Sequence, residues 1–369
     1  MMASLELAKA RLTSFAVHEA AGISPLYELL AGRAKDDDEV AALLAAAPEN
    51  FAHGTLFFAA AQRLVQAEPW IELASYYLTM GGSFGPDERV WPLFREFVLD
   101  RADRMRELIS TRTTQTNEVR RAAPMFPAIA QAAKEAAKVS KGPIGLLDVG
   151  TSAGLLLGVD RYGFRYQNEA GEQVNAGPAK TPLVLTCAAS GKPLPRLPKK
   201  LAVGAKVGLD RRPIDLRDEE ELAWLEACVW ADQPERSRTL RVAAEMQEKD
   251  RPTLVAGDAV DDLAAAAAQV PAELPLVVLT SHVLPYMSDD RRQEFVAAVA
   301  ALAATRPLWW VSQEHYLAAM TYLVPGRKEF EDHPKENWGL LGLVRWESGK
   351  PDARLLGRTG AHGQSLSWL

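Results

Sequence analysis

Residues 143–154 have the sequence PIGLLDVGTSAG, and they set the architecture that we expect for the second half of the chain. A short apolar run ends at Asp148 and is followed by a bend of small residues, which is typical of a buried strand. Gly150 allows a sharp exit from this strand, and Gly154 allows the next segment to pack closely. We expect a helix from Leu155 onward, whose first backbone N–H groups are free to meet polar atoms of a ligand.

The same pattern recurs downstream, with an apolar run, then polar residues, then a helical stretch. The apolar runs at 203–209, 253–257, 276–279 and 308–311 lead into Asp210, Asp258, Ser281-His282 and Gln313-Glu314. Helical patterns occupy residues 218–230, 235–248, 261–270 and 289–304. Strands that alternate with helices predict an α/β fold with a doubly wound parallel sheet. Residues 341–347 and 354–356 flank a turn and predict an antiparallel hairpin that closes the sheet.

The character of the chain changes near residue 140. Residues 1–140 carry apolar residues at helical spacing and no alternating strand pattern, so they predict an all-helical N-terminal or cap domain. Ser24 followed by Pro25 is typical of an N-cap and a first helical position. Residues 141–369 form the predicted Rossmann-like domain. Within it, residues 160–202 are rich in Gly, Pro and Lys and are interpreted as an insertion.

Composition argues against several classes of function. The 42 Lys and Arg residues face 48 Asp and Glu, and this net charge of -6 disfavours nucleic-acid binding. Cys187 and Cys228 are too few for a disulfide scaffold or a four-Cys zinc site, and no His or Cys pair has metal-ligand spacing. We see no targeting segment and no apolar run of about 18 residues. We therefore expect a cytoplasmic protein that acts on a small molecule, with no metal and no membrane span.

Three interpretations of the bend compete. A dinucleotide fingerprint needs glycines at relative positions one, three and six, where this chain has Gly150, Ser152 and Leu155. A turn that binds S-adenosylmethionine prefers small residues at positions one, three and five after an acidic strand end, which Asp148, Gly150, Ser152 and Gly154 provide. The same residues also spell G-x-S-x-G, the nucleophile elbow of serine hydrolases.

The hydrolase interpretation makes Ser152 a nucleophile, with Asp258 and one of His282, His315 or His362 as its partners. A hydrolase elbow follows several strands and an oxyanion loop. Ser152 follows the first predicted strand, so we favour the methyltransferase interpretation. A glycine-rich turn with no ligand is the remaining alternative.

Acidic residues after the second and third strands extend the predicted cofactor site, because ligands of open α/β sheets bind beyond the carboxyl ends of the strands. Asp210 stands where a carboxylate takes the ribose hydroxyls, and a helix-capping role explains it equally well. Asp258, beside Ala259, is placed to meet the adenine amino group or to cap the next helix. The predicted cofactor-binding residues are Asp148, Gly150, Ser152, Gly154, Asp210, Asp258, Ala259 and Ser281.

Segments 146–157, 208–210 and 257–259 together resemble the class I S-adenosylmethionine-dependent methyltransferases. Two departures are Ser152 in place of a glycine and the acidic residue Asp210, which lies further along the chain from Asp148 than is usual. The resemblance covers about residues 141–360 and implies a Rossmann-like domain that binds S-adenosylmethionine. Over nearly its full length the chain also resembles a bacterial family known only as a domain of unknown function. That likeness lies in residues 111–118, 148–157, 208–210 with Pro213, 228–233, 257–263 and 309–312.

Methyl transfer from a sulfonium is an in-line displacement, to which an enzyme contributes positioning and sometimes a base. His282 and Glu314, which follow the fourth and fifth strands, are the catalytic candidates. For His282, a hydrogen-bonded structural role is the alternative. We expect a methyltransferase that acts on a small-molecule acceptor, with a serine hydrolase and a non-catalytic ligand-binding protein as alternatives.

The helical part contributes one further group of polar residues. Arg112, Gln115, Asn117 and Glu118 lie between two helical stretches and predict a lid that orders the acceptor. The alternative is that Thr116 or Asn117 caps the next helix and Arg112 forms a surface ion pair.

Overall fold

The computed structural model describes residues 1–331 and 338–369, which divide into two compact units. The helical unit comprises residues 1–117 and 215–241, and the sheet unit comprises residues 118–214 and 242–369. The first boundary lies at 117 and not near 140, because helix α7 (Ala122–Ala136) packs against strands of the sheet. Residues 215–241 rejoin the helical unit because Trp224, on α8 (Glu219–Ala227), belongs to its hydrophobic core.

Caps and aromatic packing define the helical unit. Ser24 accepts the N–H of Tyr27 with Pro25 at the helix start, as predicted. The rings of Tyr27 and Phe58 stack with centroids 4.5 Å apart. The helices of this unit are α1 (Leu5–Ser14), η1 (Phe15–Ala20), α2 (Pro25–Ala34), α3 (Asp38–Leu44), α4 (Gly54–Ala67), η2 (Glu72–Tyr76), η3 (Leu78–Met80), α5 (Val90–Asp100), α6 (Ala102–Thr111), α8, and the first part of α9 (Pro234–Glu248).

A single sheet organises the sheet unit. Its eleven described strands lie in the order β3-β2-β4-β11-β10-β9-β8-β7-β1-β5-β6. These strands are β1 (Ile144–Val149), β2 (Gly163–Gln167), β3 (Gln173–Ala176), β4 (Val184–Gly191), β5 (Val203–Asp210), β6 (Thr253–Ala256), β7 (Leu276–Ser281), β8 (Leu308–Glu314), β9 (Trp338–Glu347), β10 (Lys350–Gly360) and β11 (Ser365–Trp368). The helical segments that accompany them are η4 (Val119–Arg121), α7, η5 (Leu155–Gly158), the end of α9, α10 (Leu263–Ala267), η6 (Leu284–Tyr286), α11 (Asp289–Ala303), η7 (Tyr316–Ala318), η8 (Met320–Tyr322) and η9 (Lys328–Phe330).

Five neighbouring strands, β6-β5-β1-β7-β8, run parallel and confirm the expected α/β class. In chain order they read 3-2-1-4-5, as in doubly wound nucleotide-binding sheets. From β1 the chain first builds outward through β5 and β6, and then crosses to the other side of β1 at β7. The topological switch point therefore lies between β1 and β7, and ligands of such sheets bind at its carboxyl edge.

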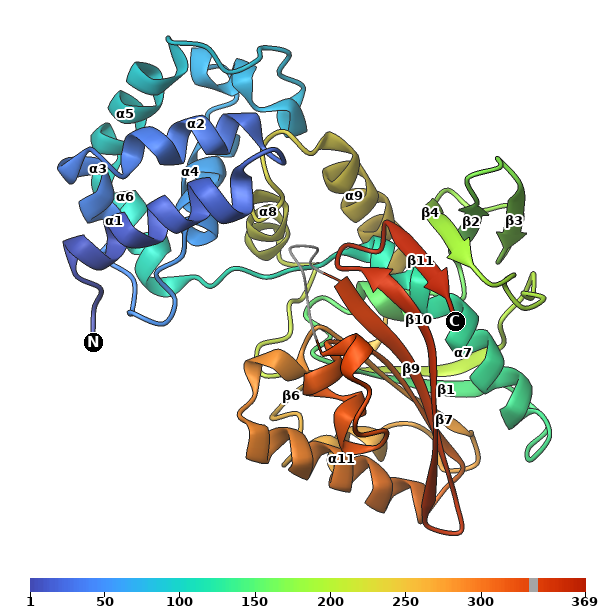
Figure 1. The fold of residues 1–369 in the computed structure, drawn as a ribbon. Helices are drawn as coiled ribbons and strands as arrows, with labels where there is room; N and C mark the ends of the chain where they lie inside the picture. Colours follow the sequence, from blue (N-terminus) through green and yellow to red (C-terminus); the bar gives the residue numbers. More distant parts are fainter. Residues whose placement is uncertain (332–337) are drawn as a thin grey trace. The chain divides into compact units, whose positions relative to one another are not determined.

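Helices cover both faces of the parallel strands, as Figure 1 shows for α7 and α11. Trp309 donates its indole N–H to Glu135 of α7 over 2.9 Å. Its neighbour Trp310 packs edge-on against Phe295 of α11, with ring centroids 5.6 Å apart. Successive side chains of a strand point to opposite faces, so the two tryptophans anchor the two layers. None of the helices in the described ranges is long and apolar enough to cross a membrane.

Three expectations about the sheet unit need correction. Residues 160–202 do not form a separate insertion, because β2, β3 and β4 join the same sheet and β4 pairs with β11 in parallel. The antiparallel hairpin is present as β9 and β10, but it does not close the sheet, since β11 and β4 continue beyond it. The predicted helix from Leu155 is only the four-residue 3-10 segment η5.

Candidate functional site at the carboxyl edge of the sheet

The bend after β1 uses a left-handed backbone at three positions. Gly150, Ser152 and Gly154 have φ values of 75°, 51° and 74°. A positive φ suits glycine but strains serine, by about 1–2 kcal/mol. The N–H groups of Gly150 and Thr151 both donate to the carbonyl of Leu209, and that of Gly154 donates to Thr151. The protein itself therefore binds these three N–H groups of the bend.

Close packing explains why this bend needs glycines. A Cβ atom at Gly150 would lie 2.5 Å from Cγ2 of Val283, and one at Gly154 would lie 3.0 Å from Cγ of Pro252. Thr151 and Ser152 are each only 5% exposed, whereas Gly150 is solvent-exposed. The middle of the bend is thus filled by the fold, and its accessible part is Gly150, beside the loop that follows β7.

Asp148 lies beneath the bend and holds it in place. Its Oδ2 accepts the hydroxyl of Thr151 over 2.7 Å, and the residue is 3% exposed. Burial, together with the nearby Asp210 carboxylate, raises the pKa of Asp148 to about 7, despite the hydrogen bond from Thr151. A buried carboxyl group at this position supports the turn from below.

Asp210, at the end of β5, joins that strand to the bend. One carboxylate oxygen accepts the N–H of Ser152 over 2.8 Å, and the other accepts the N–H of Arg212 over 2.9 Å. Each carboxylate oxygen has two lone pairs, so one acceptor position per oxygen remains for a ligand hydroxyl. The side chain is partly buried at the carboxyl edge, next to the switch point.

Asp258, after β6, is engaged by the protein on both oxygens. Oδ1 accepts the N–H groups of Val260 and Asp261 and the guanidinium of Arg291, while Oδ2 accepts two N–H groups of Arg211. Burial works against ionisation, but these donors outweigh it and hold the pKa of Asp258 well below its usual range. The arrangement matches the turn-capping alternative more closely than the adenine-binding role, and Ala259 lies half-buried within the same turn.

His282 begins the loop after β7 and also has a left-handed backbone, with a φ of 55°. Apart from Ser152 and His282, the described residues contain one non-glycine with positive φ, Ser348 in the β9–β10 turn. The two strands that flank the switch point are therefore each followed by a strained residue. Strain of this kind clusters at functional sites.

The imidazole of His282 is held neutral. Its Nε2 atom is buried and forms no hydrogen bond with the described residues, and a Cβ at Gly339 would lie 3.2 Å from it. Burial, with the positive Arg121 and the neighbouring His362 and His315, lowers the pKa of His282 to about 3. At neutral pH the ring therefore presents an uncharged nitrogen at this edge.

Glu314 lies directly behind this loop. It is 0% exposed, and its Oε1 accepts the N–H of Val283 over 3.1 Å. Burial raises the pKa of Glu314 to about 8, even though backbone N–H groups of Val283 and Leu284 favour the ionised form. The carboxyl group thus acts on His282 through the backbone of the next residue.

A chain of buried and part-buried hydrogen bonds crosses four strands at the same edge. The Ser281 hydroxyl donates to Gln313 over 3.1 Å, the Gln313 amide donates to Thr359 over 3.0 Å, and the Thr359 hydroxyl donates to the Gly339 carbonyl over 3.2 Å. Arg121 of η4 donates to the carbonyl of Ala361, just after β10. No local sequence pattern marks Thr359, Gly339 or Arg121 as site residues, because only the sheet brings them to β7.

A family model matches residues 9–368 of the chain. The chain belongs to the bacterial family described as "Uncharacterized protein conserved in bacteria (DUF2332)". Comparison with curated proteins and with solved structures finds no significant match.

The four predicted lid residues of this family member fall in different units. Arg112, Gln115 and Asn117 belong to the helical unit, and Glu118 belongs to the sheet unit. Arg112 forms an ion pair with Glu221 and lies over the ring of Trp224, 5.7 Å from its centroid. Glu118 accepts the N–H of Arg120 and so caps η4. The contacts of Arg112 thus match the ion-pair alternative.

Two residues of the hydrolase interpretation, Asp258 and His282, can be compared with that role. The partners of Asp258 are arginines and backbone N–H groups, and none is an imidazole. Nε2 of His282 has no hydrogen bond among the described residues, so it does not meet Ser152. The described part of the chain also contains no group of three or more His, Cys, Asp or Glu side chains that could hold a metal ion.

Proposed function

We propose that this DUF2332 protein is an S-adenosylmethionine-dependent methyltransferase that acts on a small-molecule acceptor. One observation carries the proposal: the acid–glycine bend 148–154 follows the central strand at the switch point of a 3-2-1-4-5 parallel sheet. Asp210, at the end of the adjacent strand, lies 2.8 Å from the backbone of that bend. This combination supports a nucleoside-binding edge.

The residues of the edge fit such a cofactor in part. Asp210 has acceptor capacity for ribose hydroxyls, and the exposed Gly150 offers backbone that a ligand can approach. Two features differ from the expectation. The short η5 supplies no long helix dipole at the bend, and Asp258 is already bound by Arg211 and Arg291. Recognition would therefore rest on Asp210 and on the loop 281–286.

S-adenosylmethionine, when bound, supplies an electrophilic methyl group on a sulfonium. The chain's contribution is to orient the acceptor and exclude water. His282 remains the proposed base because its ring is neutral at neutral pH, and its buried Nε2 must become accessible when the acceptor binds. Glu314 serves as a positioning residue, since it holds the loop through the N–H of Val283.

Titration calorimetry of the full chain with S-adenosylmethionine and S-adenosylhomocysteine tests the proposal. We expect both to bind, and we expect Asp210→Asn to weaken binding roughly ten- to a hundredfold, the range for losing hydrogen bonds to a charged group. Asp352→Asn, an exposed acid on the distant β9–β10 hairpin, is the matched control and should bind as the unmodified chain does. The melting temperature without ligand separates loss of binding from loss of the turn.

The results separate the functional alternatives. Absence of binding at millimolar ligand would reject the methyltransferase. Binding without turnover on a broad acceptor panel would favour the non-catalytic ligand-binding protein.

A serine hydrolase remains the second candidate, because Ser152 stands at the centre of G-x-S-x-G with a φ of 51°. Its burial and the engaged state of Asp258 weigh against this candidate. A fluorophosphonate probe decides the matter. Labelling that disappears in Ser152→Ala would establish the hydrolase, and an unlabelled protein would eliminate it.

A further inference from the structure

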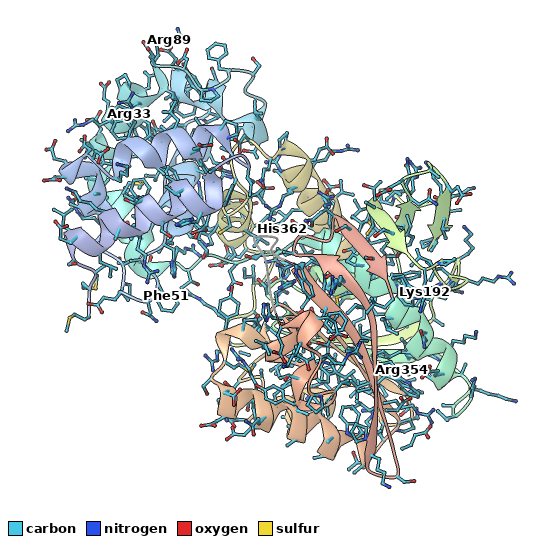
Figure 2. The ribbon with its side chains drawn as sticks, in the orientation of Figure 1. Arg33, Phe51, Arg89, Lys192, Arg354 and His362 are labelled. Atoms are coloured by element: carbon cyan, nitrogen blue, oxygen red, sulfur yellow. The ribbon has the colours of Figure 1, made fainter. Side chains whose placement is uncertain are left out.

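The sheet unit contains a cavity of about 450 Å³ beside β10 and η9, away from the bend after β1. A volume of this size is typical of sites for small molecules. Val324, Ala353 and Leu355 contribute apolar surface beside the almost fully buried Phe330, and Lys192, Arg327, Glu329 and Arg358 contribute charge. Lys192 follows β4 and is labelled in Figure 2.

The wall formed by residues 324–330 is fixed from within. The Tyr316 hydroxyl donates to the carbonyl of Val324 over 2.7 Å and accepts the N–H of Arg327 over 3.1 Å. Tyr316 is 0% exposed and Phe330 is 2% exposed, so both ends of the wall are anchored in the core. A ligand entering the cavity would meet a preformed surface, which reduces the entropy lost on binding.

The side chains around the cavity carry an excess of positive charge. Arg327 is paired with Glu329, at 2.7 Å. Arg358 donates one hydrogen bond to the carbonyl of Glu329 and lies over the Phe330 ring, 5.0 Å from its centroid. Among the described residues, neither Arg358 nor Lys192 has an acidic side chain within ion-pair distance. Two cationic groups therefore face the cavity with most of their donors uncommitted.

We propose that this cavity binds a small carboxylate with an apolar body, its anionic group at Lys192 and Arg358 and its apolar part against Val324, Ala353 and Leu355. A carboxylate accepts charge-assisted hydrogen bonds from both cations, and the planar fork of Arg358 suits its geometry. The aliphatic lining favours a ligand whose apolar part is removed from water on binding. The proposal is independent of the methyltransferase assignment, because the cavity and the bend share no residue.

Calorimetry with 2-naphthoate as the probe and its neutral isostere 2-naphthamide tests the charge requirement on the full chain. We expect naphthoate to bind and naphthamide to bind at least about tenfold more weakly, as loss of charge-assisted hydrogen bonds implies. Lys192→Gln and Arg358→Gln should each weaken naphthoate binding by about tenfold. Both side chains are exposed, and the melting temperature of each variant without ligand separates loss of binding from loss of the Arg358 contacts with the Glu329 carbonyl and the Phe330 ring.

Lys350→Gln is the matched control, because Lys350 is an exposed lysine on the same strand as Arg358 and does not line the cavity. Its affinity for naphthoate should equal that of the unmodified chain. Three outcomes would overturn the proposal: no naphthoate binding at millimolar concentration, equal affinity for the two probes, or unchanged affinity in both Lys192→Gln and Arg358→Gln.

Discussion

Replacement of Glu314 by glutamine should increase the stability of the sheet unit over that of the unmodified chain, and this gain should be larger at alkaline pH than at acidic pH. Glu314 is completely buried, and its Oε1 accepts the N–H of Val283 behind the His282 loop. Glutamine keeps an oxygen for that N–H but cannot ionise. The variant therefore removes the titration and preserves the hydrogen bond.

The sign and size follow from the pKa of Glu314, which burial raises from 4.5 to about 8. Below pH 4.5 the carboxyl is protonated in both folded and unfolded chains, and its contribution to stability is fully present. As the pH rises toward about 8, only the unfolded chain releases the proton, so the folded state progressively loses this stability. At about 1.4 kcal/mol per pKa unit, the upper bound of the loss is about 5 kcal/mol.

Urea unfolding of both proteins across the pH range measures this difference in the free energy of unfolding. Hydrogen exchange of the β7 peptide reports the unfolding of the sheet unit. Titration of other groups cancels in the comparison. Asp148→Asn is the control: because burial raises the pKa of Asp148 to about 7, its pH-dependent difference should level off about one unit earlier. The infrared band of a protonated carboxyl group should also weaken in Glu314→Gln at neutral pH. A difference that stays constant from about pH 5 to about pH 9 would refute the reasoning.

Two further changes probe the bend and the opposite face of the sheet. Gly150→Ala should destabilise the sheet unit by roughly 2–4 kcal/mol in thermal unfolding, because strain at positive φ adds to a clash with Val283. Gly171→Ala, with φ 82° and open space, is the control and should cost only about 1 kcal/mol; equal effects would contradict the packing argument. Burial disfavours the ionised form of Glu135, but the ion pair with Arg354 outweighs burial and lowers the pKa of Glu135 to about 2. The stability that this carboxylate contributes is therefore present above pH 4.5 and is lost as the pH falls toward 2. Glu135→Gln should abolish this acid-side loss, of at most about 3 kcal/mol, in acid-unfolding curves, and an unchanged curve would reject it.

Local pattern predicted most of the parallel sheet. The five apolar runs correspond to strands β1, β5, β6, β7 and β8. The polar residues Asp148, Asp210, Asp258, Ser281 and Glu314 lie at the ends of these strands or just after them. Buried parallel strands need continuous apolar runs, and their ends need polar residues, so both signals are written locally. The pattern could not reveal that residues 160–202 extend the sheet, because pairing partners such as β11 lie far away in the chain.

Only some residues of the candidate site could be predicted from the sequence. His282 directly follows β7 and Glu314 is the last residue of β8, so their positions after apolar runs identify both as candidates. Thr359 and Arg121 reach the same edge through pairing and packing that no short window of sequence contains. The glycines of the bend were correctly read as a tight turn, but their tightness serves contacts with Val283 and Pro252 within the fold.

By itself, the amino-acid sequence determined the α/β class, the positions of the central strands and the acid–glycine bend at their carboxyl edge, because hydrophobic periodicity and backbone freedom are local properties. Only the tertiary structure decided which polar atoms remain available. Asp258 is bound by two arginines, whereas Nε2 of His282 forms no hydrogen bond within the described ranges. Hydrogen-bond capacity is consumed by neighbours in space, and burial sets the protonation state of what is left.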